Sequence, residues 1–194
     1  FMSAHILFEP ENLSPFGPLT LLRSVAELRY GIYSNIERAE RSLTDSSLQM
    51  WVRPILEKSH RENYPAIPIN ENADDQAIFL NAATPAWMYA PALAILDNKN
   101  GRSVRIDGHI VAAKPGIALK FTSNFHESLE QLDSLDCDAE LCNAHPKWIW
   151  DYLDFIAPAL EYDFEFWKLE KDILDKLPPD LSTLHDRNIY IHNT

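Results

Sequence analysis

Residues 18–32, which read PLTLLRSVAELRYGI, decide how the rest of this sequence is interpreted. They follow an apolar run at residues 6–8 that we expect to be the first strand of a sheet, so they lie where a strand gives way to a helix. Ligands of open α/β sheets bind at this place. Arg23 and Arg29 stand here among apolar and small residues, and a guanidinium is always charged and offers planar donors suited to phosphate. We therefore predict an anion site at these arginines; the alternative is that both are surface cations paired with neighbours such as Glu27.

Short apolar segments alternate with helical patterns along the chain. This order predicts an α/β fold, with a mostly parallel sheet, helices on both faces and an appended β-hairpin. A second apolar strand at residues 77–80 ends at Asn81, where a ligand crevice would open. Asn81 could bind a nucleotide or sugar through its amide, or only close a turn at the end of the strand. The hairpin is expected over residues 103–113, because Asp107-Gly108 supplies the positive backbone angles of a two-residue turn.

Two helices are predicted from local signals. Ser34 and Glu37 form a capping-box pattern at the start of a helix over residues 34–43. The aromatic-rich segment 148–177 is expected to be helical, with Asp163 on its exposed side. Two other segments have weaker patterns: residues 48–59 are expected to be helix or loop, and the acidic residues 133–140 an exposed linker.

Residues 7–32, LFEPENLSPFGPLTLLRSVAELRYGI, also resemble the opening of a known family. This is the bacterial sugar nucleotidyltransferase-like family, which is similar to the uridyltransferase half of the bifunctional N-acetylglucosamine-1-phosphate uridyltransferase/acetyltransferase. Its members read Pro-Leu-Thr, then Arg-Pro-Val-Ala-Glu-Leu-Arg and Gly-Ile; here Ser24 replaces the usual proline. Looser similarities occur at residues 79–81, 150–151 and 188–192.

The resemblance implies a domain organisation. Residues 1–187 would form a Rossmann-like nucleotidyltransferase domain. Residues 188–194 would begin a C-terminal extension, because they resemble the first coil of the left-handed β-helix that follows this domain in its family. Through such a β-helix the full-length protein could form a homo-oligomer.

The same resemblance implies an activity and its site. The expected reaction transfers a nucleoside monophosphate from a nucleoside triphosphate to a sugar-1-phosphate and releases pyrophosphate. The site residues would be Arg23 and Arg29 as catalytic phosphate clamps, Gly17, Pro18, Leu19 and Thr20 as substrate-binding loop contacts, and Asn81 as a nucleotide or sugar contact. No general base is identified.

Three departures from the family pattern favour a second interpretation. Of the glycine-rich loop only Gly17 remains, the lysine beside the Pro-Leu-Thr block is missing, and Asn81 replaces the aspartate that holds magnesium. Mg²⁺ is thus expected only if the site is active, and its ligands are not identified; Asp74 and Asp75 are the nearest carboxylates. The alternative is a catalytically degenerate domain that binds a nucleotide sugar or orients a β-helix acyltransferase.

Composition narrows the classes of partner. The 194 residues, 46% of them hydrophobic, suit one domain, and the formal net charge of −12 repels polyanions. Nucleic acid and membranes are therefore not expected partners, and no run approaches the ~20 apolar residues of a membrane span. Cys137 and Cys142 are too far apart for a Cys-x-x-Cys knuckle. We expect reduced thiols in a cytoplasmic protein.

Overall fold

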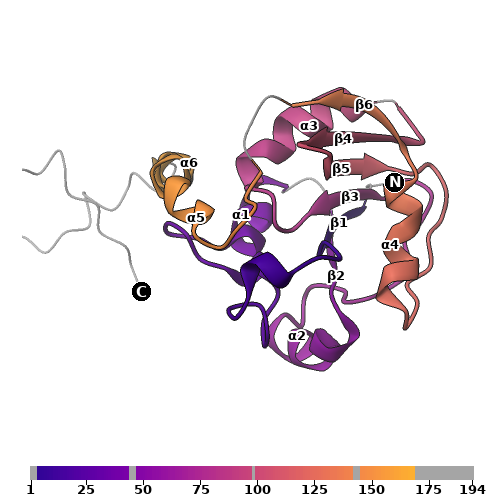
Figure 1. The fold of residues 1–194 in the computed structure, drawn as a ribbon, viewed down its shortest axis with the longest axis horizontal. Helices are drawn as coiled ribbons and strands as arrows, with labels where there is room; N and C mark the ends of the chain where they lie inside the picture. Colours follow the sequence, from indigo (N-terminus) through magenta and orange to yellow (C-terminus); the bar gives the residue numbers. More distant parts are fainter. Residues whose placement is uncertain (1–3, 44–46, 98, 142–144, 169–194) are drawn as a thin grey trace, which may run out of the picture.

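The computed structural model describes residues 4–43, 47–97, 99–141 and 145–168, and these residues contain a six-stranded sheet with the order β2-β1-β3-β5-β4-β6 (Figure 1). The strands are β1 (Ala4–Phe8), β2 (Ser47–Trp51), β3 (Ile78–Asn81), β4 (Arg102–Ile106), β5 (His109–Lys114) and β6 (Asp136–Glu140). β1 is parallel to β2 and β3, β6 is parallel to β4, and β5 is antiparallel to both its neighbours. This arrangement confirms the predicted mostly parallel α/β sheet.

The helices pack on both faces of this sheet, as predicted. They are α1 (Asn35–Ser42), α2 (Glu57–Asn63), α3 (Tyr89–Leu96), α4 (Phe125–Asp133), α5 (Asp151–Asp154) and α6 (Ile156–Lys168). Four 3₁₀ turns are also present, η1 (Ser14–Phe16), η2 (Val25–Glu27), η3 (Pro54–Leu56) and η4 (Ala86–Met88). Figure 1 shows α4 on one face and α1 and α3 on the other. No helix within the described ranges has the length and apolar character needed to cross a membrane.

The central strand β1 is buried along its whole length, because helices cover both of its faces. Its side chains alternate between two hydrophobic clusters. Ile6 and Phe8 belong to the cluster under α4, whereas Leu7 belongs to the larger cluster under α1 and α3.

Local sequence signals located α1 and the β4–β5 hairpin correctly. The Ser34 Oγ accepts a hydrogen bond from the Glu37 N–H at 3.4 Å, and the Glu37 carboxylate accepts one from the Ser34 N–H at 2.6 Å. In the hairpin turn, Asp107 has φ 49° and Gly108 has φ 78°. These are the positive angles that the turn requires.

Two segments differ from expectation. Residues 48–59 were expected to be helix or loop. Residues 52–59 are, since they lead through η3 into α2, but residues 48–51 belong to strand β2. Residues 133–140, expected to be a linker, include the largely exposed edge strand β6. In both strands the backbone pairing with a neighbour, β1 or β4, decides the structure, and the local side-chain pattern carries no signal of that pairing.

Asp163 is not on the exposed side of its helix: it is fully buried and lies against Arg38 of α1. The predicted extension at residues 188–194 and the second thiol, Cys142, lie outside the described residues. The thiol that is described, Cys137, is free and exposed.

Candidate functional site

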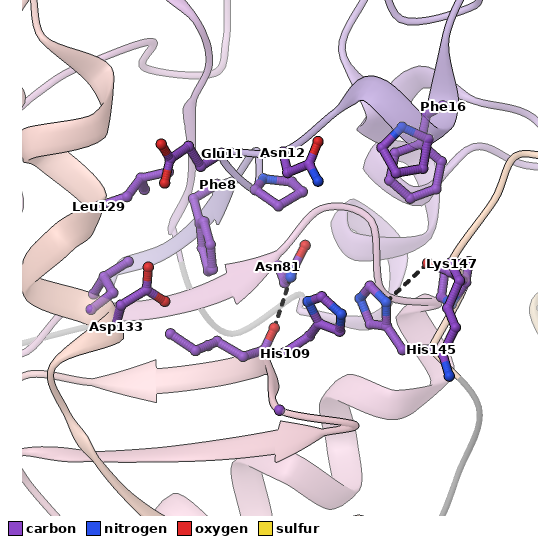
Figure 2. A pocket seen from close by; sticks show the side chains of 16 residues that line it. Phe8, Glu11, Asn12, Phe16, Asn81, His109, Leu129, Asp133, His145 and Lys147 are labelled. Carbon is purple, nitrogen blue, oxygen red and sulfur yellow. Dashed lines mark hydrogen bonds between the residues drawn. The ribbon is translucent and has the colours of Figure 1, made fainter.

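A crevice opens at the carboxyl ends of β1 and β3. From β1 the chain continues to β2 on one side and later to β3 on the other, so the strand order changes direction here. The cavity at this point has a volume of about 330 Å³ (Figure 2). Its apolar wall is formed by Phe8, Pro10, Pro15, Phe16, Ile110, Leu129 and Leu132, and its polar side chains are Glu11, Asn12, Asn81, His109, Asp133, His145 and Lys147.

Asn81 lies at the centre of this crevice (Figure 2), but both ends of its amide are already bonded. Its Nδ2 donates to the carbonyl of Ile110 at 2.8 Å, and its Oδ1 accepts from the N–H of Ala83 at 2.9 Å. The side chain is 3% exposed. Asn81 therefore joins β3 to β5 and closes the turn after β3, while it also lines the cavity in which a ligand contact was predicted.

Two histidines stack against each other at the crevice. The ring centroids of His109 and His145 are 4.6 Å apart and the rings are inclined by 20° (Figure 2). His145 is buried, and its Nδ1 lies 3.0 Å from the carbonyl oxygen of Pro146, which can only accept. Burial first, and the neighbouring His109 second, lower the pKa of His145 to about 4. His145 is thus neutral at pH 7, with the proton on Nδ1.

This pair could not be predicted from the sequence, because no spacing pattern connects two histidines that lie 36 positions apart. The start of β5 places His109, and the segment before α5 places His145. Only the sheet brings the two together.

The described residues around the crevice supply little positive charge. Glu11 and Asp133 contribute carboxylates, and among the described residues that line the crevice Lys147 is the one lysine or arginine. Glu11 lies 2.8 Å from Nδ1 of His126, and Lys147 lies 3.3 Å from Asp107. A polyphosphate bound here would therefore need further cations, besides Lys147, to compensate its charge.

The residues of the crevice do not fit a preformed magnesium site. The bonds to Ile110 and Ala83 hold the Asn81 amide, at the position where the resemblance implies an aspartate. Within the described ranges, no group of three histidine, cysteine, aspartate or glutamate side chains is placed to hold a metal ion. The acidic neighbours noted in the sequence, Asp74 and Asp75, are exposed in the loop before β3.

Arg23 and Arg29 line a different cavity, of about 460 Å³. Its other lining residues are Leu19, Leu28, Tyr30, Ile149, Trp150, Tyr152, Leu153 and Ile156. Arg29 is exposed and donates from Nη2 to both carboxylate oxygens of Glu37, each at 2.9 Å. Arg23 is exposed, and no described residue accepts a hydrogen bond from its guanidinium. The suggested partner Glu27 instead contacts His60 at 3.1 Å and Tyr64 at 3.2 Å.

The two cavities lie on opposite sides of one contact between distant segments. Pro15 and Phe16 line the crevice, and Ile149 and Tyr152 line the second cavity. The N–H of Ile149 donates to the carbonyl of Pro15 at 3.2 Å, and the rings of Phe16 and Tyr152 are 5.9 Å apart. The structure therefore does not bring Asn81 and the two arginines into one site.

Among the predicted loop contacts, Leu19 alone lines one of the two cavities. Gly17 ends η1, where its N–H donates to the carbonyl of Ser14 at 3.2 Å, and Pro18 follows it. Leu19 lines the second cavity. Thr20 is buried, and its carbonyl accepts a hydrogen bond from Nη2 of Arg53 at 2.5 Å.

A buried carboxylate, that of Glu9, holds this block in place. Glu9 is completely buried; its Oε1 accepts from the N–H of Val25 at 3.2 Å. Its Oε2 accepts from the N–H of Arg53 at 3.0 Å and from Nε of the same residue at 3.2 Å. The Arg53 guanidinium also donates to the carbonyl of Arg23 at 3.2 Å. These hydrogen bonds therefore hold the backbone of Thr20 and Arg23 in place.

Comparison with known proteins supports the resemblance seen at residues 7–32. The sequence profile of the sugar nucleotidyl transferase family matches residues 5–172, most of the chain and nearly all of the described fold. No curated protein matches the chain. With its mostly parallel sheet and its crevice at the ends of β1 and β3, the chain belongs to the sugar nucleotidyl transferase family.

Proposed function

We propose that this protein transfers a nucleoside monophosphate from a nucleoside triphosphate to a sugar-1-phosphate, in the crevice between the ends of β1 and β3. The observation that carries the proposal is the position of that crevice at the switch point of the sheet, in a chain of the sugar nucleotidyl transferase family. A sugar-phosphate oxygen would attack the α-phosphorus in line, and pyrophosphate would leave.

In this reaction the protein binds and orients the two substrates. The apolar wall, which includes Phe8 and Phe16, suits a planar base, and Lys147 is the cation that can approach a phosphate from the rim. The proposal assigns no protein ligand to magnesium. Arg23, at the second cavity, remains a proposed anion contact, whereas Arg29 is paired with Glu37.

A pyrophosphate-release assay over a panel of nucleoside triphosphates and sugar-1-phosphates, with magnesium, tests the proposal. We expect turnover with at least one pair. Lys147→Ala should lower kcat/KM at least about tenfold, because a hydrogen bond to a charged group is worth about 1.5–3 kcal/mol. Lys99→Ala is the matched control, since Lys99 is also an exposed lysine paired with an aspartate, Asp138, but lies outside the crevice. Turnover that Lys147→Ala leaves unchanged would contradict the assigned site.

A second candidate is a domain that binds a nucleotide sugar without turnover, or that orients a β-helix acyltransferase. The carboxylates of Glu11 and Asp133 favour it, because they oppose the charge of a triphosphate more than that of a nucleotide sugar. A thermal-shift screen separates the two. A bound nucleotide sugar at 100 times its Kd stabilises the fold by about 2.7 kcal/mol. Such a shift without pyrophosphate release would support binding alone.

A further inference from the structure

The second cavity, which Arg23 and Arg29 line, is a candidate site for a different class of ligand. Its volume of about 460 Å³ falls in the range of small-molecule sites, roughly 300–1,000 Å³. It lies between the segments on either side of η2 and the helices α5 and α6 with the residues just before them. It does not depend on the reaction proposed for the crevice.

The walls of this cavity offer almost no hydrogen-bonding groups. The hydroxyl of Tyr30 donates to Asn35 Oδ1 at 2.6 Å, and the hydroxyl of Tyr152 donates to the carbonyl of Ala83 at 2.8 Å. Both tyrosines therefore use their polar ends in the core and present ring carbon to the cavity. A nucleobase, whose edges need several polar partners, is a poor match for such walls.

The mouth of the cavity is apolar as well. Leu153 is 68% exposed, Trp150 58% and Leu19 53%, and the Trp150 ring stacks on that of Trp148 with centroids 5.2 Å apart. Large apolar side chains that are gathered at a cavity mouth mark a binding surface more often than a free one.

The charged groups that line the cavity are both positive. Glu37 already neutralises Arg29, so Arg23 is the guanidinium that is available to an anion. A single exposed cation beside apolar walls is an unusual feature in a chain with a formal net charge of −12. It is complementary to one anionic group attached to an apolar body.

Hydrogen bonds and an ion pair outside the cavity hold its framework. Arg53 holds the carbonyls of Thr20 and Arg23, while the buried pair of Arg38 and Asp163 fixes the backbone around Tyr30. A site whose backbone is fixed in this way loses little conformational entropy on binding.

We propose that this cavity binds a small soluble amphiphile, with an apolar body against Tyr30, Trp150 and Leu153 and one anionic oxygen-bearing head group at Arg23. The site is distinct from the crevice.

Isothermal titration calorimetry on the full 194-residue chain, with octyl phosphate below its critical micelle concentration, tests this proposal. Octyl phosphate should bind at a 1:1 ratio. Octyl glucoside has the same chain and a neutral head, and inorganic phosphate has the head alone; each should bind at least about tenfold more weakly. Equal binding of the glucoside, or no binding of octyl phosphate, would overturn the proposal.

Three variants locate the site. Arg23→Ala should weaken octyl phosphate binding about tenfold, as the loss of one charged contact predicts. Leu153→Glu should weaken it by a similar factor, because the new carboxylate stands at the mouth, and Leu153 is too exposed for this change to unfold the chain. Arg102→Ala removes a partly exposed cation outside the cavity and should change the affinity less than twofold.

Competing occupants give different results. If a second copy of the chain binds over this cavity instead, sedimentation will show a concentration-dependent dimer that Leu153→Glu dissociates. If the mouth of the cavity binds a membrane surface instead, the chain will bind vesicles of anionic lipid and not octyl phosphate. Either result overturns the proposal.

Discussion

Arg38 and Asp163, 125 positions apart in the sequence, form a completely buried ion pair. The Arg38 Nε donates to Asp163 Oδ1 at 2.7 Å and its Nη2 donates to Oδ2 at 2.8 Å. Oδ2 also accepts from the N–H groups of Ile32 and Tyr33, at 2.9 and 3.2 Å. The guanidinium lies 4.5 Å from the centroid of the Tyr30 ring. One carboxylate thus fastens α6 to both α1 and the end of the 18–32 block.

Asp163→Asn should strongly destabilise the fold. An amide keeps the shape of the side chain but cannot neutralise Arg38, and an uncompensated buried charge costs about 3–5 kcal/mol. Chemical denaturation should show this loss in the free energy of unfolding. The control Glu161→Gln, at an exposed position of the same helix, should stay within about 0.5 kcal/mol of the wild type. A loss below about 1 kcal/mol for Asp163→Asn would mean that the pair does not hold α6 in solution.

Gly31→Ala should disturb the same ion pair, because the added methyl group would lie against both of its side chains. Gly31 has φ 114°, and a Cβ at this position would lie 2.9 Å from Arg38 Nη2 and 3.0 Å from Asp163 Oδ2. We expect a cost of at least about 2 kcal/mol from backbone strain and contact together. Gly101→Ala isolates the backbone term, because Gly101 has φ 69° but its Cβ would meet no atom closer than 4.0 Å. It should cost about 1 kcal/mol. Equal losses in the two variants would show that the contact with the pair is unimportant.

His145→Gln should flatten the dependence of stability on pH. The pKa of the folded His145 is lowered to about 4, and its ordinary value is 6.5. Between these values the unfolded chain binds a proton that the folded chain does not, so stability falls as the pH falls from 6.5 towards 4. From pH 7.5 to pH 5 this group should cost the wild type about 2 kcal/mol.

Denaturation of both proteins at pH 7.5, 6.5 and 5 measures this component. His126→Gln is the control. Because His126 is exposed, this variant should keep the pH dependence of stability that His145 contributes. The burial of His145 would be disproved by identical pH profiles for the wild type and His145→Gln.

Asn81→Asp should destabilise the crevice instead of restoring a metal site. The aspartate would face the Ile110 carbonyl without a proton to donate, and the loss of such a buried bond costs about 1–3 kcal/mol. Thermal unfolding in the presence and absence of magnesium measures the change. Asn12→Asp is the matched control, since Asn12 is exposed and its Oδ1 already acts only as an acceptor from Ser14. A gain in stability with magnesium that is confined to Asn81→Asp would refute this expectation.

Local signals in the sequence were sufficient where a structure depends on near neighbours. The capping box at Ser34 and Glu37 and the turn at Asp107-Gly108 both act within four residues, and both are formed as expected. The apolar runs of β1 and β3 indicate burial on both faces, and together with the alternating order of elements they predict the α/β sheet. By contrast, β2 and β6 form through pairing with β1 and β4, and their own residues carry little signal of it.

The sequence by itself determined the fold class, the strand ends where a crevice opens and the family to which the chain belongs, because each depends on patterns of adjacent residues. Only the tertiary structure decided which side chains share a site. It separated Asn81 from Arg23 and Arg29, stacked His109 on His145 and buried Asp163 against Arg38. Those contacts join residues that are tens of positions apart, and burial, which sets their charges and free energies, is a property of the packed chain.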